Sequence, residues 1–141
     1  MNTPPVIRIL LDSPTAQYQP GDRLAGRFLV EGTQMRTIRS AELSVLWYTA
    51  GKGEEDFAVH LFERHVDDVA RPLDLRVPRK FATKLPASPL SYDGEIVKVC
   101  WCVRVRLFMP QIHESVAEIP FRLGNVSIGT EIAPDVPDEQ V

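Results

Sequence analysis

The feature that most limits what this chain can fold into is the alternation of residue types between Ile96 and Phe108. Every second position from Val97 onward is apolar, and the positions between them are mostly polar, charged or cysteine: Lys98, Cys100, Cys102, Arg104, Arg106 and Phe108. A period of two places alternate side chains on opposite faces of a β-strand, whereas a helix repeats about every 3.6 residues. We therefore predict one long strand with one buried face, the central strand of a sheet.

The stretch before this strand, residues 85–94, reads Leu-Pro-Ala-Ser-Pro-Leu-Ser-Tyr-Asp-Gly. Its prolines favour an extended approach, and Asp93-Gly94 favours a tight turn in which Gly94 takes a positive φ. Farther upstream, Tyr18-Gln19-Pro20-Gly21-Asp22 has the residues of a second turn, with Gly21 in the left-handed conformation. Both stretches are predicted to punctuate strands.

Other short runs with alternating apolar residues predict the remaining strands. They cover approximately residues 6–11, 24–30, 38–49, 57–64 and 115–123, with short pieces at 74–77 and 81–85. No segment has a convincing helical period, and turn signals recur about every ten residues, which is typical of a sandwich or barrel. We predict an all-β, immunoglobulin-like antiparallel β-sandwich of seven to eight strands, with Trp47, Trp101 and Phe121 in its core.

Length and charge set the domain organisation and exclude several classes of partner. A chain of 141 residues is most simply one domain, here predicted to span residues 1–127, followed by an acidic, proline-containing tail at 128–141. The net charge of −3 predicts no nucleic-acid partner. No apolar run approaches the roughly 20 residues of a transmembrane segment, and no signal peptide is visible.

Cys100 and Cys102 lie two residues apart on the same face of the predicted strand. An extended strand holds their Cα atoms near the upper limit for a disulfide, so we predict two free thiols. Free thiols without a visible signal peptide indicate a cytoplasmic location.

Two groups of residues are candidates for binding a protein partner. Lys98, Arg104 and Arg106 share one face of the long strand and form a basic stripe. Their alternative role is to pair with cross-strand acids such as Glu42 or Glu118, and the acidic tail could also fold onto them.

The second group lies in the irregular region from Leu73 to Leu85. Its short, proline-flanked pieces suit the edge of a sheet, where an added strand from a partner could pair with the backbone. Lys80, Ala82 and Lys84 are the candidate contact residues there.

No catalytic, cofactor-binding or metal-binding residues are predicted, and no cofactor is expected. The glycines at 51–53 lack the helix and the Lys-Ser/Thr pair of a phosphate-binding loop. The cysteines and histidines are too scattered for a structural zinc site. The pairs Cys102–His60 and Ser91–His113 lack any local activating feature for a nucleophile.

The two turn motifs, with Glu118-Ile-Pro-Phe121 near the last strand, resemble the N-terminal domain of arrestin-like proteins. This group includes arrestins, the retromer cargo subunit and bacterial sporulation-control proteins. The resemblance covers roughly residues 6–123 and implies a protein-binding sandwich without catalytic activity. Members of the group carry two sandwiches in tandem, whereas this sequence contains one, so a homodimer or a larger assembly is a further hypothesis.

From this resemblance and the absence of catalytic motifs, we predict a non-catalytic protein-interaction or scaffold module, adaptor-like, that binds a protein through an edge strand or a sheet face. The alternative is a β-sandwich that binds a small ligand such as a carbohydrate. That role would need a row of exposed aromatic residues, and both tryptophans stand at positions that are predicted to face inward.

Overall fold

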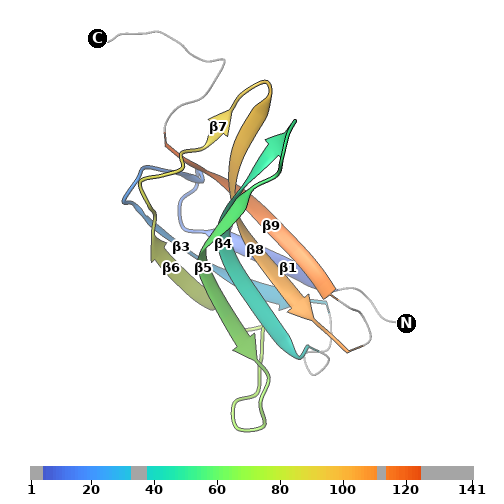
Figure 1. Cartoon of the computed structure of the whole chain (residues 1–141). Helices are drawn as coiled ribbons and strands as arrows, with labels where there is room; N and C mark the ends of the chain where they lie inside the picture. The colour runs from blue at the N-terminus through green and yellow to red at the C-terminus, as the bar shows by residue number, and fades with distance from the viewer. Residues whose placement is uncertain (1–4, 33–37, 111–113, 125–141) are drawn as a thin grey trace.

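A computed structural model describes residues 5–32, 38–110 and 114–124 of the chain (Figure 1). Every regular element within these residues is a β-strand, which confirms the all-β prediction. The predicted tail at 128–141 and the domain boundary at 127 lie outside the described residues. The nine strands are β1 (Val6–Leu11), β2 (Gln17–Tyr18), β3 (Arg23–Glu31), β4 (Ser40–Gly51), β5 (Phe57–Val66), β6 (Arg79–Lys84), β7 (Tyr92–Asp93), β8 (Val97–Phe108) and β9 (Glu114–Leu123).

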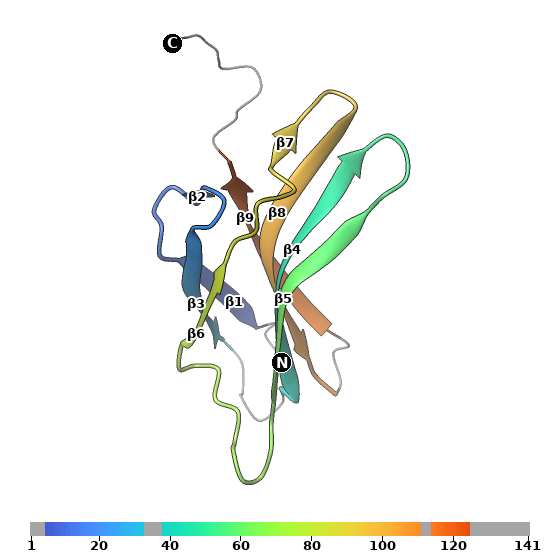
Figure 2. The same ribbon diagram turned by 60° about the vertical axis from the view of Figure 1, so that its left-hand side comes forward.

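The strands form two sheets that pack face to face (Figure 2). The smaller sheet has the order β1-β3-β6, and the larger has the order β2-β9-β8-β4-β5 with β7 paired to β8. All pairings are antiparallel except the short one between β2 and β9. The β-sandwich is therefore confirmed, and β8 lies inside the larger sheet as its alternation predicted.

The core lies between the sheets and is filled by the apolar positions of the alternating strands. On β8, Trp101 and Val103 are almost fully buried, and β3 contributes Leu24 and Phe28 from the opposite sheet. Trp47 is partly buried against the same cluster. Removing these side chains from water is the main favourable term for a sandwich of this kind.

At one end of the sandwich, the Pro-Gly-Asp turn is hydrogen-bonded to the start of the proline-rich approach. The Gly21 N–H donates to the Leu85 carbonyl at 3.0 Å, and the Leu85 N–H donates to the Asp22 carbonyl at 2.9 Å. Gly21 has φ of +87°, which confirms the left-handed turn. Two motifs separated by some sixty residues of sequence therefore meet directly.

The same end also holds the last strand in place. The Leu123 N–H donates to Ser91 Oγ and the Ser91 N–H donates to the Leu123 carbonyl, both at 2.8 Å. The Gly124 N–H donates to the Tyr18 carbonyl at 2.7 Å. The three stretches that resemble arrestin-like proteins thus meet at this end through two groups of hydrogen bonds. The residues of both groups are named here the end lock: Tyr18, Gly21, Asp22, Leu85, Ser91, Leu123 and Gly124.

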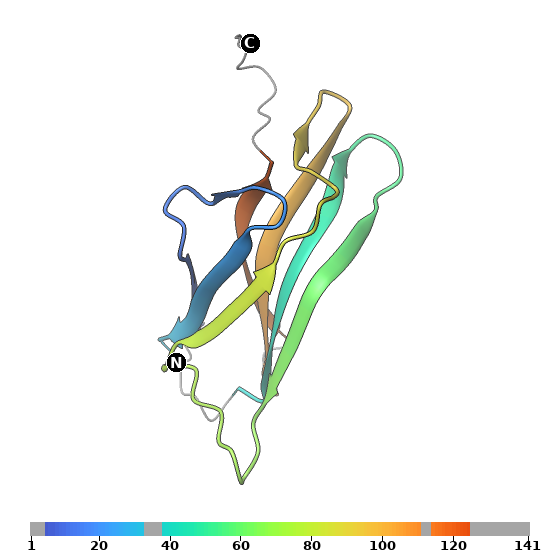
Figure 3. The same cartoon turned by 90° about the vertical axis from the view of Figure 1, so that its left-hand side faces the viewer.

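The two sides of the sandwich differ. On one side the chain crosses from β1 in the smaller sheet to β2 in the larger, and β2 pairs with β9. On the other side, β5 and β6 are the edge strands of their sheets, and residues 67–78 connect them along the sequence (Figure 3). The β1–β2 crossing therefore bridges the two sheets on the β2–β9 side, whereas β5 and β6 each keep an edge that no described strand pairs with. The β5–β6 side is named here the open side.

Two local predictions were wrong. Residues 74–77 form a turn in place of a strand, because the Asp74 carboxylate accepts hydrogen bonds from the backbone N–H and the Nε of Arg76. Gly94 does not have a positive φ. A glycine is needed there for space, since a Cβ would lie 2.4 Å from the Tyr92 ring and 2.8 Å from the Val97 carbonyl oxygen.

Gly26 allows β1 and β3 to approach each other, and its replacement tests the packing of the smaller sheet. A Cβ at this position would lie 2.4 Å from the Leu10 carbonyl oxygen, which is backbone and must move. We expect Gly26→Ala to lower the free energy of unfolding by about 3 kcal/mol or more, measured by urea denaturation. Gly53→Ala is the control, because no atom lies within 4 Å and only its positive φ adds a cost of about 1 kcal/mol. An equal effect of the two substitutions would contradict this account.

Candidate functional site

β6 lies at an edge of the smaller sheet, as predicted, and its backbone polar groups follow a fixed alternation. The Leu85 N–H points to β3, because it donates to Asp22. In an antiparallel pair, successive residues point their N–H and C=O groups to opposite sides of the strand. The backbone groups of Lys80, Ala82 and Lys84 therefore point away from β3, toward the free edge.

His60 closes one end of this free edge. It is the extra residue of a bulge in β5, where Leu61 pairs with Val45 and Val59 pairs with Leu46. Its Nε2–H donates to the Lys84 carbonyl at 2.9 Å, and its ring stacks edge-on against Trp101 at 6.2 Å. The backbone groups of Lys80 and Ala82 form the accessible part of the edge beyond this contact.

The outer face of the smaller sheet is strongly basic next to this edge. The register pairs Arg23 with Lys84, Ala25 with Ala82, and Arg27 with Lys80, so these side chains share the face that points away from the core. The four cations are exposed, whereas Ala25 is buried between them. The candidate residues Lys80, Ala82 and Lys84 thus belong to a larger group, named here the basic face: Arg23, Arg27, Lys80 and Lys84.

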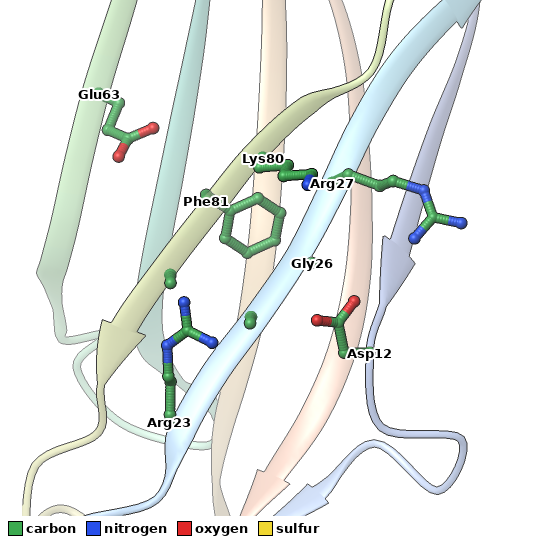
Figure 4. Close-up of a pocket in the computed structure, with 9 residues that line it drawn as sticks. Asp12, Arg23, Gly26, Arg27, Glu63, Lys80 and Phe81 are labelled. Carbon is green, nitrogen blue, oxygen red and sulfur yellow. The ribbon is translucent and has the colours of Figure 1, made fainter.

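The small residues at the centre of this face leave a hollow of about 510 Å³ (Figure 4). Ala25, Gly26 and Ala82 line it, and Arg23, Arg27 and Lys80 surround them. Asp12, just after β1, and Glu63, on β5, lie on opposite sides of the hollow. The arrangement is a depression beside a free strand edge, with three cations and two carboxylates among its lining residues.

The predicted basic stripe on β8 is present, but each of its cations has a carboxylate partner. Arg104 Nε donates to Glu118, which was a predicted partner. Arg106 lies 3.3 Å from Glu114, and Lys98 lies 3.4 Å from Asp93. An anion that bound Lys98, Arg104 and Arg106 would have to compete with these carboxylates. Partner binding at the stripe stays a prediction.

Cys102 and His60, one of the two nucleophile–base pairs considered from the sequence, lie on opposite faces of the larger sheet. Both thiols are free, and Cys102 is buried on the outer face of β8, whereas His60 contacts Trp101 on the inner face. His113, the predicted partner of Ser91, lies outside the described residues. Within residues 5–32, 38–110 and 114–124, no group of three or more His, Cys, Asp or Glu residues is placed to hold a metal ion.

Comparisons with known proteins support the architecture. No protein-family model matches the chain, and no curated protein matches its sequence. Among solved structures it is similar to Spo0M, a sporulation control protein from Bacillus subtilis, with a TM-score of 0.59 and 14% sequence identity. The fold is an arrestin-like β-sandwich. The match covers 86% of this chain and 50% of Spo0M, so the chain spans half the length of that protein.

The sequence reasoning missed Arg23 and Arg27. Their spacing of four residues along one strand places them on the same face, which could have been noticed. Their positions opposite Lys84 and Lys80 depend on the register between β3 and β6, which no local pattern reveals. Separately, the described residues contain no helix that is long and apolar enough to span a bilayer.

The aromatic residues do not form the row that a carbohydrate site would need. Phe57 and Phe62 are exposed on the outer face of β5. Tyr92 is exposed too, but it pairs with Val99 and so belongs to the inner face of the same sheet. Trp101 is 1% exposed. These positions do not favour the small-ligand alternative.

Cys102 provides a test of the packing on the outer face of β8. Burial raises the pKa of its thiol to about 12, and Glu118 adds to the rise. We expect Cys102 of the native protein to resist iodoacetamide at about pH 8, because the thiolate is the reactive form, and to react once the chain is unfolded. Mass spectrometry of peptides measures both reactions. Rapid alkylation in the native state would contradict this account.

The same pKa shift predicts a dependence of stability on pH. The folded-state value lies above the ordinary thiol value of 9.0, so its contribution is complete below pH 9 and is lost as the pH rises toward 12. Urea denaturation in this range should therefore show a steeper loss of stability for the wild type than for Cys102→Ala. Parallel curves for the two proteins would argue against a buried thiol.

Proposed function

We propose that the chain is a non-catalytic protein-interaction module, adaptor-like or scaffold-like, that binds an extended segment of another protein along β6. Strand addition needs a free edge whose backbone groups are accessible. The single observation that carries the proposal is the outward direction of the backbone groups of Lys80 and Ala82 beside an open side of the sandwich.

The chemistry of the described residues favours this function over catalysis. Cys102 and His60 lie on opposite faces of the larger sheet, and Cys102 carries a raised pKa, opposite to what an activated thiol needs. The likeness in fold to Spo0M supports the architecture on which the proposal rests. The outward backbone groups of Lys80 and Ala82 support the proposed mode of binding.

A homodimer or a larger assembly is the related proposal for the oligomeric state. β5 is also an edge strand, and it exposes Phe57, Val59 and Phe62 on its outer face. Exposed apolar side chains on an edge favour contact with another chain. Light scattering of the wild type and of Phe62→Ser tests this: a dimer that dissociates on substitution supports it, and a monomeric wild type opposes it.

Ala82→Pro tests the edge without breaking the ladder to β3. Proline removes the outward N–H of Ala82, whereas the neighbouring bonds to β3 come from other residues. We expect the free energy of unfolding to change by less than about 1 kcal/mol. We also expect peptides selected from a random displayed library on the wild-type protein to lose binding to this variant.

Two further variants control this experiment. Arg64→Pro removes an N–H that points outward from the β5 edge. This direction follows because the Asp67 N–H donates to the Arg39 carbonyl of the β4 side, so alternate residues of β5 point the other way. The variant should leave the selected peptides bound. Thr83→Pro removes a ladder donor and should destabilise the fold by at least about 1 kcal/mol. Unchanged peptide binding by a folded Ala82→Pro protein would refute the proposed function.

A further inference from the structure

The basic face contains an arrangement that weakens the sheet unless an anion is present. Arg23 stands opposite Lys84, and Arg27 stands opposite Lys80. Because the bonded pairs are those of the intervening residues, these two pairs occupy the non-hydrogen-bonded register, in which cross-strand side chains are closest. Like charges directly opposite each other are destabilising.

Among the described residues, no carboxylate forms an ion pair with these four cations. On the outer face of the smaller sheet, Glu31 is paired with Arg8 at 2.6 Å. Asp12 lies at the rim of the hollow, and it forms no ion pair within 4.0 Å in the part of the chain that the structure describes. The same holds for Arg23, Arg27, Lys80 and Lys84. Within the described residues, four neighbouring cations therefore have no paired carboxylate.

We propose that the segment bound along β6 is acidic and extended, with Asp or Glu at every second position facing Lys80 and Lys84. This inference rests on the proposed function and adds the chemistry of the partner. Charge complementarity carries it: the four cations lie beside the free backbone edge, and carboxylates are their natural counter-charges.

The dimensions of a sheet fit this assignment. A strand added to β6 would lie about 4.8 Å from it, and its alternate residues would share the outer face with Lys80, Ala82 and Lys84. Carboxylates at those positions neighbour the two lysines directly. The longer side chains of Arg23 and Arg27 stand one strand farther away, within reach of the same carboxylates.

The intervening positions of the segment have a different environment. Their side chains would face the inner surface of β5, where Leu61 and Glu63 pair with the buried core residues of β4. Leu61 packs against the core, and Glu63 borders the hollow and would repel a second carboxylate. The two environments therefore favour a segment in which acidic residues on the outer face alternate with uncharged residues on the side of β5. They disfavour a continuous run of acidic residues.

The probe is a short synthetic peptide in which Glu alternates with Val. Two control peptides accompany it. In the first, Gln replaces each Glu; in the second, the same residues are rearranged into one block of Glu and one block of Val. Isothermal titration and amide chemical shifts of the full chain, at about 50 mM and about 500 mM NaCl, measure affinity and location. We expect the alternating Glu peptide to bind about tenfold more tightly than either control at low salt, and to shift the amides of β6.

Charge reversal on the protein completes the test. Lys80→Glu with Lys84→Glu should weaken binding of the alternating Glu peptide about tenfold or more. The same variant should gain affinity for a peptide in which Lys alternates with Val. Lys52→Glu with Arg71→Glu is the matched control: it changes the net charge equally, outside β3 and β6, and should leave binding unchanged.

The outcomes separate the two proposals. If the Gln peptide binds β6 as tightly as the Glu peptide, the acidic-partner inference fails and the edge-binding function survives. If none of the peptides perturbs β6, both fail. Equal affinity for the alternating and block Glu peptides, or binding of phosphatidylserine vesicles without binding of the alternating peptide, also overturns the inference.

Discussion

The end lock is the constraint on which the rest of the structure depends. A two-sheet sandwich is held mainly by non-directional apolar contacts, which do not fix how one sheet is rotated or shifted against the other. The hydrogen bonds of Leu85 with Gly21 and Asp22, and those of Ser91 and Tyr18 with the end of β9, supply that direction. They tie three stretches far apart in sequence to one end of the sandwich, and they leave the β5–β6 side open.

This asymmetry determines where the proposed partner segment could bind. The β2–β9 pairing covers the side that carries the β1–β2 crossing, whereas β6 keeps backbone groups that no neighbouring strand uses. His60 joins the two sheets across the open side at the end of β6, through Thr83 and Lys84. The result is a short length of edge, bounded at one end by an imidazole, beside four cations that a chain of net charge −3 has gathered on one small sheet.

Much of the fold could be predicted from the sequence, because alternation and turn residues are local signals. The alternation of β8, the Gly21 turn and the edge position of residues 79–84 are all present in the structure. The stripe of Lys98, Arg104 and Arg106 was predicted too, with pairing to cross-strand acids as its alternative role, and Arg104 does pair with Glu118. Of the basic face, the sequence predicted Lys80 and Lys84 but not the arginines. The arginines lie beside these lysines only because of the register between β3 and β6, which is a long-range property. The strand predicted at residues 74–77 was wrong because a side-chain hydrogen bond from Arg76 to Asp74 outweighs their strand preference.

The like-charge pairs on the basic face also decide what β6 cannot bind. Two copies of this chain that met edge to edge through β6 would bring Lys80 and Lys84 of each copy against those of the other, doubling a repulsion already present in the monomer. A free edge normally carries the risk of uncontrolled aggregation. Here the cations oppose pairing of β6 with the β6 of another copy. The same four side chains would attract a segment of opposite charge.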